Sequence, residues 1–203
     1  MSSAASRRVL RLKIGAWVIL STPLAWGLYR WFLGDGFGFD PVENMLHFSG
    51  LTAVWVLIAS LAITPIRKVT GWNDLQKLRR LTGLWAFAYA LMHLSIYVSI
   101  DQWFDWALIW EDVTERPFIF SGTAALLLMV PLAATSTKGW IRRLGKRWVT
   151  LHRLAYASAG LAALHFWWGQ KADMRNALIA VAALAVLLGA RVWWALQKRR
   201  RSA

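Results

Sequence analysis

Four histidines are the residues of this chain best suited to chemistry. His93, His152 and His165 fall inside apolar segments, and His47 lies at the edge of another. The stretch "WVTLHRLAYASAGLAALHFWW", residues 148–168, carries two of them thirteen positions apart. Ionisable side chains are costly in hydrocarbon, so those inside membrane segments usually serve a function. A histidine that only hydrogen-bonds a neighbouring helix is the structural alternative, and three histidines in two segments favour function over it.

The residue types around these histidines narrow the chemistry. The chain has no cysteine, which excludes disulfides, iron–sulfur clusters, thiolate-ligated haem and zinc–cysteine sites. A zinc site would need a third ligand nearby, and a proton relay would need Asp or Glu in the apolar segments, which contain neither. Haem iron needs only two imidazoles on facing helices and an apolar pocket. The residues therefore favour bis-histidine haem.

Six apolar segments are long enough, or nearly so, to cross a bilayer, which takes about 20 residues. They cover residues 14–33, 45–64, 81–100, 117–135, 149–168 and 176–196. Hydrophobic residues make up 58% of the 203 residues, above the usual share of a soluble domain. No segment alternates as a barrel strand would, and we find no internal repeat. The sequence predicts an all-α, six-helix transmembrane bundle, with residues 1–203 as one integral membrane domain.

The charged residues orient this bundle. The N-terminal segment, residues 65–80, residues 136–148 and the C-terminal tail hold eighteen Lys and Arg against one acidic residue, Asp74. The other three connections hold Arg116, Lys171 and Arg175 against nine acidic residues. The positive-inside rule then places both termini in the cytoplasm. The net charge of +14 therefore reflects topology and contact with anionic membrane lipid, and nucleic acid is not an expected partner.

Depth along the helices pairs two of the histidines. At 1.5 Å per residue, His93 lies about 18 Å in from the cytoplasmic end of its segment, and His165 lies at a similar depth. We expect these two rings to face each other and to hold one haem. His152 lies about 20 Å below His165, and its counterpart on the facing helix would be near Arg79 or Arg80.

The spacing of His152 and His165 poses a geometric problem. Thirteen residues turn an ideal helix so that the two rings point about 140° apart. Both rings can face the same neighbour only if the helix bends or carries a bulge, for which Gly160 is the candidate position.

The other candidate residues lie nearer the membrane surfaces. His47 lies near the start of segment 45–64, at the outer interface. It either hydrogen-bonds a lipid headgroup or a loop, or makes a loose contact with a haem or a partner protein. Arg79, Arg80 and Arg153 lie near the inner ends of their helices. They are either anchors that follow the positive-inside rule or partners of haem propionates, because Arg binds carboxylates through two parallel hydrogen bonds.

Several stretches together resemble a known family. They are "DPVENMLHFSG", "ITPIR", "RRLTGLWAFAYALMHLSIY", "RPFI" and "TSTKGWIRRLGKRWVTLHRLAY" followed by "HFWW", and they cover most of residues 40–168. In order and spacing they resemble the MsrQ family, the haem-binding membrane subunits of bacterial periplasmic methionine sulfoxide reductase systems. That family lies within the wider ferric-reductase-like transmembrane family, related to the membrane domains of NADPH oxidases and STEAP proteins.

The resemblance implies a b-type cytochrome of the bacterial inner membrane. It implies one haem b or two, and FMN, with the haem histidines of the family mapping onto His93, His152 and His165. The wider family places two histidines on each of two helices, and this chain departs from that pattern with one on segment 81–100.

The resemblance also implies an electron path. Electrons would come from a cytosolic flavin reductase and NAD(P)H or from quinol, and would pass to a periplasmic molybdopterin methionine sulfoxide reductase that repairs oxidised proteins. Because the sequence has no Gly-rich dinucleotide fingerprint, a separate protein must oxidise NAD(P)H.

Two other functions stay open at this point. One is a stand-alone membrane oxidoreductase that reduces a ferric chelate or oxidises quinone, and the other is an anchor or small-solute transporter. Residues 101–116 form the longest outer connection, with five acidic residues and one basic one. We expect Asp101, Asp105, Glu111 and Asp112 to attract a basic periplasmic partner.

Overall fold

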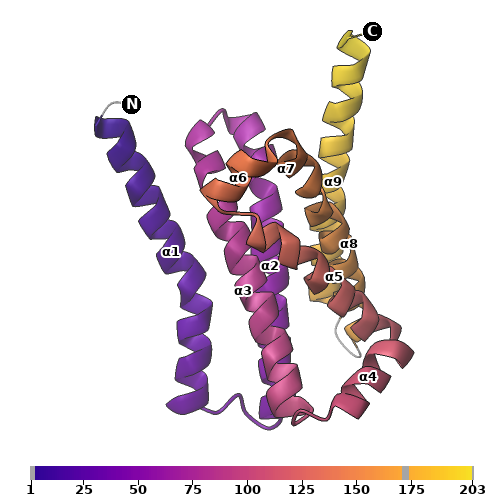
Figure 1. Ribbon diagram of the computed structural model, residues 1–203. Coiled ribbons are helices and arrows are strands. Elements are labelled where there is room, and N and C mark those ends of the chain that lie inside the picture. The colour runs from indigo at the N-terminus through magenta and orange to yellow at the C-terminus, as the bar shows by residue number, and fades with distance from the viewer. Residues whose placement is uncertain (1–2, 171–173, 203) are drawn as a thin grey trace.

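The computed structural model describes residues 3–170 and 174–202, and that part of the chain is helical and contains no strand. Residues 1–2, 171–173 and 203 lie outside it, and with them Lys171 of the outer connection. The start of α1 and the end of α9 lie at the same end of the bundle as α6 and α7, and α4 lies at the opposite end (Figure 1). The elements are α1 (Ser3–Phe32), α2 (Pro41–Thr70), the 3₁₀ turn η1 (Asn73–Lys77), α3 (Arg79–Ile96), the π-turn η2 (Tyr97–Asp101), α4 (Trp106–Glu115), α5 (Pro117–Ala134), α6 (Lys138–Leu144), α7 (Lys146–Leu151), α8 (Leu154–Gly169) and α9 (Arg175–Ser202).

Among the described residues, five helices are long and apolar enough to cross a membrane. They are Ala5–Phe32, Pro41–Thr70, Arg79–Asp101, Pro117–Ala134 and Arg175–Gln197. The predicted segment 149–168 is divided instead, because α7 ends at Leu151 and α8 begins at Leu154 and has 16 residues. Since a span takes about 20 residues, α8 alone is short. The all-helical class is confirmed, and the count of six spans stays a prediction.

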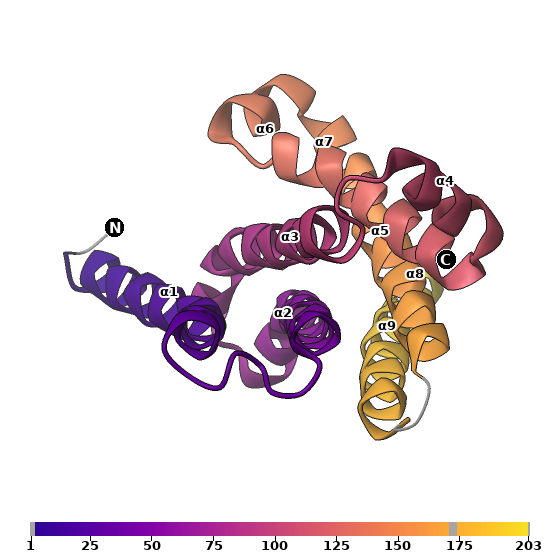
Figure 2. The ribbon, with the colours of Figure 1, turned by 90° about the horizontal axis from the view of Figure 1, so that it is seen from below.

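Two helix pairs form the centre of the bundle. α2 packs chiefly on α3, and α5 packs chiefly on α8, while α9 lies against both α8 and α2. From below, α1 is seen at the edge beside α2 and α3, and α5, α8 and α9 form the other group (Figure 2). Small buried residues bring α5 and α8 close together: Ser158 Oγ donates to the Ala125 carbonyl at 2.9 Å, and Ala159 is fully buried.

A proline inside α2 is compensated by an arginine of α9. Pro65 has no N–H, so the carbonyl of Leu61, one turn earlier, lacks its helical donor. Arg191 Nη2 donates to that carbonyl, and Arg191 Nη1 donates to the Tyr156 hydroxyl at 2.7 Å. An arginine in a membrane-spanning helix thereby ties α2, α8 and α9 together.

A tyrosine of α3 holds α1 in a similar way. α1 contains Pro23, and beside it the Tyr89 hydroxyl donates to the Leu20 carbonyl at 2.5 Å and accepts the Leu24 N–H at 3.2 Å. The hydroxyl therefore bridges the two groups that an undistorted helix would join directly. Tyr89 is 2% exposed, so this contact is buried and fixes α1 against α3 one turn below His93.

Candidate functional site

The structure brings two of the predicted site residues together. His93 on α3 and His165 on α8 have ring centres 6.1 Å apart, and the ring planes are inclined by 73°. They come from different helix pairs, so packing of the two pairs against each other creates the contact. His165 also stacks on Phe118 of α5, with ring centres 6.0 Å apart.

A backbone carbonyl fixes the orientation of each ring. His93 Nδ1 lies 3.1 Å from the Leu46 carbonyl and 3.2 Å from Ser49 Oγ, and His165 Nδ1 lies 2.7 Å from the Phe118 carbonyl. A carbonyl oxygen only accepts, so in each neutral ring Nδ1 carries the proton and Nε2 carries the lone pair. Both rings are therefore held in the tautomer whose Nε2 can bind a metal.

A glycine makes room for each ring. A Cβ atom on Gly50 would lie 3.1 Å from His93 Cε1, and one on Gly122 would lie 2.6 Å from His165 Nδ1. The second distance is far below van der Waals contact, so even alanine at position 122 would displace the ring. Each glycine lies four residues after the carbonyl that holds its histidine, so it opens the helix surface beside that carbonyl.

The two halves of the site repeat one local pattern that the sequence reading missed. The tripeptide Phe-Ser-Gly occurs at 48–50 and again at 120–122, and each histidine follows its acceptor carbonyl by 47 positions. The serines at 49 and 121 also hydrogen-bond the same two carbonyls. The sequence reading, which found no internal repeat, did not use this short pattern, although the two copies of "FSG" were a visible signal. When the two copies are aligned on their Phe-Ser-Gly tripeptides, Arg80 takes the position that His152 has in the second copy.

A cavity of about 500 Å³ surrounds the two rings. Its deep wall is apolar and includes Leu57, Ala86, Ala125 and Met129. Its outer rim is polar: it includes Asp40, Glu43, His47, Asp101, Gln102, Asp112, Arg116 and Gln170. The cavity therefore combines an apolar interior with a polar mouth at the α4 end of the bundle.

A buried carboxylate closes part of this mouth. Asp112 of α4 is 2% exposed, accepts the Tyr97 hydroxyl at 2.6 Å and pairs with Arg116 Nε at 3.0 Å. Tyr97 follows α3 and Arg116 precedes α5, so this cluster joins the ends of three helices over the cavity. Asp105 caps α4 by accepting the N–H groups of Ala107 and Leu108.

The other predicted residues lie away from the paired rings. His152 lies where the chain breaks between α7 and α8, with Nδ1 3.2 Å from the Trp148 carbonyl and its ring stacked 3.8 Å above Trp148. The helix therefore bends at His152, and the expected position, Gly160, lies inside continuous α8. In the described part of the chain, no second histidine faces His152. His47 is exposed on the cavity rim.

The three candidate arginines are also separate from the paired rings. Arg79 is half-buried, and its charge interacts with both His152 and Arg191. Arg80 donates to the Ser136 carbonyl at 3.4 Å, and Arg153 is exposed. None of the three lines the cavity around His93 and His165.

The arrangement fits a planar iron macrocycle better than a bare metal ion. Among the described residues, no three His, Cys, Asp or Glu side chains gather as a metal site. Imidazole nitrogens lie about 2 Å from a bound metal, so two rings on opposite sides of one metal have centres about 6 Å apart. The observed 6.1 Å and the apolar cavity fit a haem that His93 and His165 would hold.

The sequence of this chain is similar to those of known proteins. Residues 49–163 match the ferric reductase like transmembrane component family. A protein of Xanthomonas euvesicatoria pv. vesicatoria named protein-methionine-sulfoxide reductase heme-binding subunit MsrQ is 46% identical over 182 residues, which is 89% of this chain and 84% of that protein. The chain belongs to the MsrQ family. Another MsrQ relative, from Rhodospirillum rubrum, is 44% identical over 189 residues, 93% of this chain and 90% of its own length.

Further relatives also match most of the chain. A third MsrQ relative, from Xanthomonas campestris pv. campestris, is 47% identical over 169 residues, 83% of this chain and 78% of its own length. Because the relatives cover most of the chain, the resemblance to MsrQ seen in the sequence is confirmed. The wider family match includes His93 and His152 and ends two positions before His165.

Proposed function

We propose that this chain is the haem-binding membrane subunit of a methionine sulfoxide reductase system. It carries electrons across the bacterial inner membrane to a periplasmic molybdopterin enzyme that repairs oxidised methionine. A cytosolic flavin reductase that uses NAD(P)H, or quinol, supplies the electrons. The observation that carries the proposal is the pair His93 and His165, whose rings lie 6.1 Å apart in an apolar cavity. The names of the MsrQ relatives support it.

In this proposal the protein's own residues hold and insulate the cofactor. A haem b bound between His93 and His165 supplies a one-electron iron couple. The carbonyls of Leu46 and Phe118 hold both Nδ1–H groups, which leaves the lone pair of each Nε2 available for iron and makes each ring a better donor. The apolar deep wall excludes water and lowers the local dielectric, which helps to set the potential.

A second haem and FMN stay predictions from the resemblance. His152 would be the ligand of an inner haem, and Arg79, Arg80 or Arg153 would be the propionate partners. No step of the proposal runs through FMN or an inner haem.

The proposed orientation has both termini in the cytoplasm and the mouth of the cavity at the periplasm. The eighteen-to-three division of basic residues supports it, and so does the common end at which α1 begins and α9 finishes. A reporter fused to the C-terminus should be active only in its cytosolic form. Activity of a periplasmic reporter at that position would reverse the orientation.

Reconstituted electron transfer tests the function. The purified chain in proteoliposomes is supplied with flavin reductase and NADH, or with quinol, on the side of the termini, and with methionine sulfoxide reductase on the other. We expect methionine sulfoxide to be reduced only when the chain is present. Reduction of a ferric chelate without any transfer to the reductase would favour the stand-alone oxidoreductase instead.

The prediction that four acids of residues 101–116 attract a basic partner needs a correction. Asp112 is buried against Tyr97 and Arg116, so it cannot meet a partner, whereas Asp105 caps α4 and is still exposed. The exposed acids of this connection are Asp101, Asp105, Glu111 and Glu115. They flank exposed aromatic side chains, Trp103, Trp106 and Trp110 among them.

We expect neutralisation of three of these acids, as D101N, E111Q and E115Q together, to slow transfer to the periplasmic reductase. Asp105 is kept in this variant because it caps α4. Electrostatic steering raises association rates by 10–10³, so the loss at low salt should be about tenfold and should shrink as salt rises. Stopped-flow oxidation of the reduced chain measures it. Reduction by the donor on the other side is the internal control and should not change. Equal oxidation rates at low salt would exclude this surface as the docking site.

A further inference from the structure

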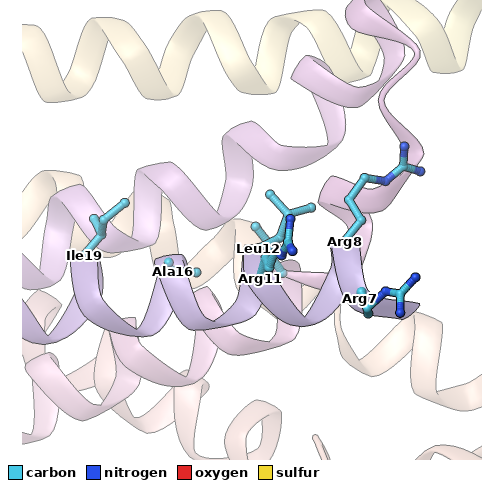
Figure 3. A pocket seen from close by; sticks show the side chains of 8 residues that line it. Arg7, Arg8, Arg11, Leu12, Ala16 and Ile19 are labelled. Atoms are coloured by element: carbon cyan, nitrogen blue, oxygen red, sulfur yellow. The ribbon is translucent and has the colours of Figure 1, made fainter. Parts of the chain in front are cut away.

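An open cavity of about 740 Å³ lies between the first half of α1 and the start of α3, far from the paired histidines. Arg7, Arg8 and Arg11 line one part of it (Figure 3). The rest is apolar or small: Leu12, Gly15, Ala16 and Ile19 on α1, and Leu78 on the opposite wall. A Cβ atom on Gly15 would meet nothing within 4 Å, so this face of α1 is unfilled.

Contacts at both ends keep this space in place. At the basic end, Arg8 pairs with Asp74 at 2.5 Å. Further along α1, Trp17 meets Trp85 edge to face with ring centres 5.2 Å apart, and the Tyr89 contact follows. α1 is therefore attached to the rest of the bundle at both ends of the cavity.

The charges in the cavity are not matched by protein acids. A hydrogen bond from Lys77 and the charge of Arg8 hold the pKa of Asp74 below its ordinary value. At neutral pH this carboxylate is therefore ionised, and it is already paired with Arg8 and Lys77. In residues 3–170 and 174–202, no carboxylate lies within ion-pair distance of Arg7 or Arg11. The cavity thus presents two exposed cations that no carboxylate of the described residues neutralises.

The length of α1 places these cations at the membrane surface. The apolar span Ala5–Phe32 has 28 residues, which is about 42 Å of helix, whereas the hydrocarbon core is about 30 Å thick. A 20-residue crossing that ends at Phe32 begins near residue 13, so Arg7, Arg8 and Arg11 lie level with the lipid headgroups. Ala16 and Ile19, one to two turns deeper than Arg11, lie level with the acyl chains, and Leu12 lies at the boundary between the two levels.

We propose that this cavity binds one anionic phospholipid of the leaflet on the basic side, such as phosphatidylglycerol. Its phosphate lies on Arg7 and Arg11, and one acyl chain lies along Leu12, Ala16 and Ile19 against Leu78. Basic pockets between membrane helices on the cytoplasmic side are suited to anionic lipid headgroups. The bound lipid fills the gap beneath α1 and makes the position of that helix dependent on anionic lipid.

Native mass spectrometry of the full chain in detergent, titrated with phosphatidylglycerol or phosphatidylethanolamine, tests the site. We expect phosphatidylglycerol to bind more tightly, and R7Q with R11Q to weaken it about thirtyfold, at about a factor of five for each basic residue. The matched control is R142Q with R143Q, which removes two exposed arginines of α6 at the same end of the bundle. The control should bind as the wild type does.

A second pair of variants separates shape from charge. G15L fills the cavity and should also weaken phosphatidylglycerol binding, whereas G189L, at an equally open position on α9, should not. Three outcomes would each overturn the proposal: equal binding of phosphatidylethanolamine, equal loss in the α6 control, or no effect of G15L. Displacement of the lipid by excess inorganic phosphate would identify a soluble-anion site and overturn the assignment to lipid.

Discussion

Replacement of either His93 or His165 by alanine should remove the haem held between α3 and α8. Loss of a group that only orients a metal ligand lowers metal affinity by 10–100-fold, so loss of the ligand itself should cost at least about that much. The pyridine haemochrome content of the purified variants measures the loss. The reduced-minus-oxidised spectrum shows whether the low-spin bands of a bis-histidine haem are gone.

His47→Ala is the matched control for these variants. His47 lies on the rim of the same cavity but is exposed, and its ring is not paired with another. This variant should keep the haem content and the low-spin spectrum of the wild type. An unchanged spectrum in either His93→Ala or His165→Ala would mean that the ligands are other residues.

Gly122→Ala should damage the site although it adds only one methyl group. The new Cβ would lie 2.6 Å from His165 Nδ1, so the ring must move and its hydrogen bond to the Phe118 carbonyl must break. We expect haem affinity to fall by about 10–100-fold, as it does when an orienting hydrogen bond is lost. Haem titration of the apoprotein, followed by absorbance, measures this affinity.

The glycines of this chain form a graded series for that experiment. Gly50→Ala should have a smaller effect, because its Cβ would lie 3.1 Å from His93 Cε1. Gly160→Ala on α8 is the control, since a Cβ there meets nothing within 4 Å and alanine favours a helix. If Gly160→Ala lost as much haem as Gly122→Ala, the loss would reflect helix perturbation, and close packing on His165 would not be its cause.

The sequence was sufficient for the features that hydrophobicity and depth control. Five of the six predicted segments correspond to helices long enough to cross a membrane. The juxtaposition of His93 and His165 could be anticipated because a helix advances by a fixed rise per residue, so equal depth on neighbouring helices follows from counting. The family resemblance was also visible in short stretches such as "ENMLHFSG" and "RPFI".

Features that depend on backbone distortion could not be predicted in the same way. The segment with His152 and His165 is apolar throughout, and hydrophobicity does not reveal that the chain breaks after Leu151 and resumes at Leu154. The burial of Asp112 depends on Tyr97 and Arg116, which reach it from two other elements. Its charge alone indicated an exposed acid. The connection between α5 and α8 contains two short helices, α6 and α7, which are too short to show a long apolar pattern in the sequence.

Haem iron per polypeptide, measured in the wild type, His93→Ala, His165→Ala and the double variant, tests the central claim most directly. If both rings hold one haem, the two single variants and the double variant should all lose the same amount of iron. Any haem held elsewhere, for example at His152, would remain equally in all three. A double variant that loses as much iron as the two single variants added together would show that His93 and His165 serve different haems. That result would contradict the shared site.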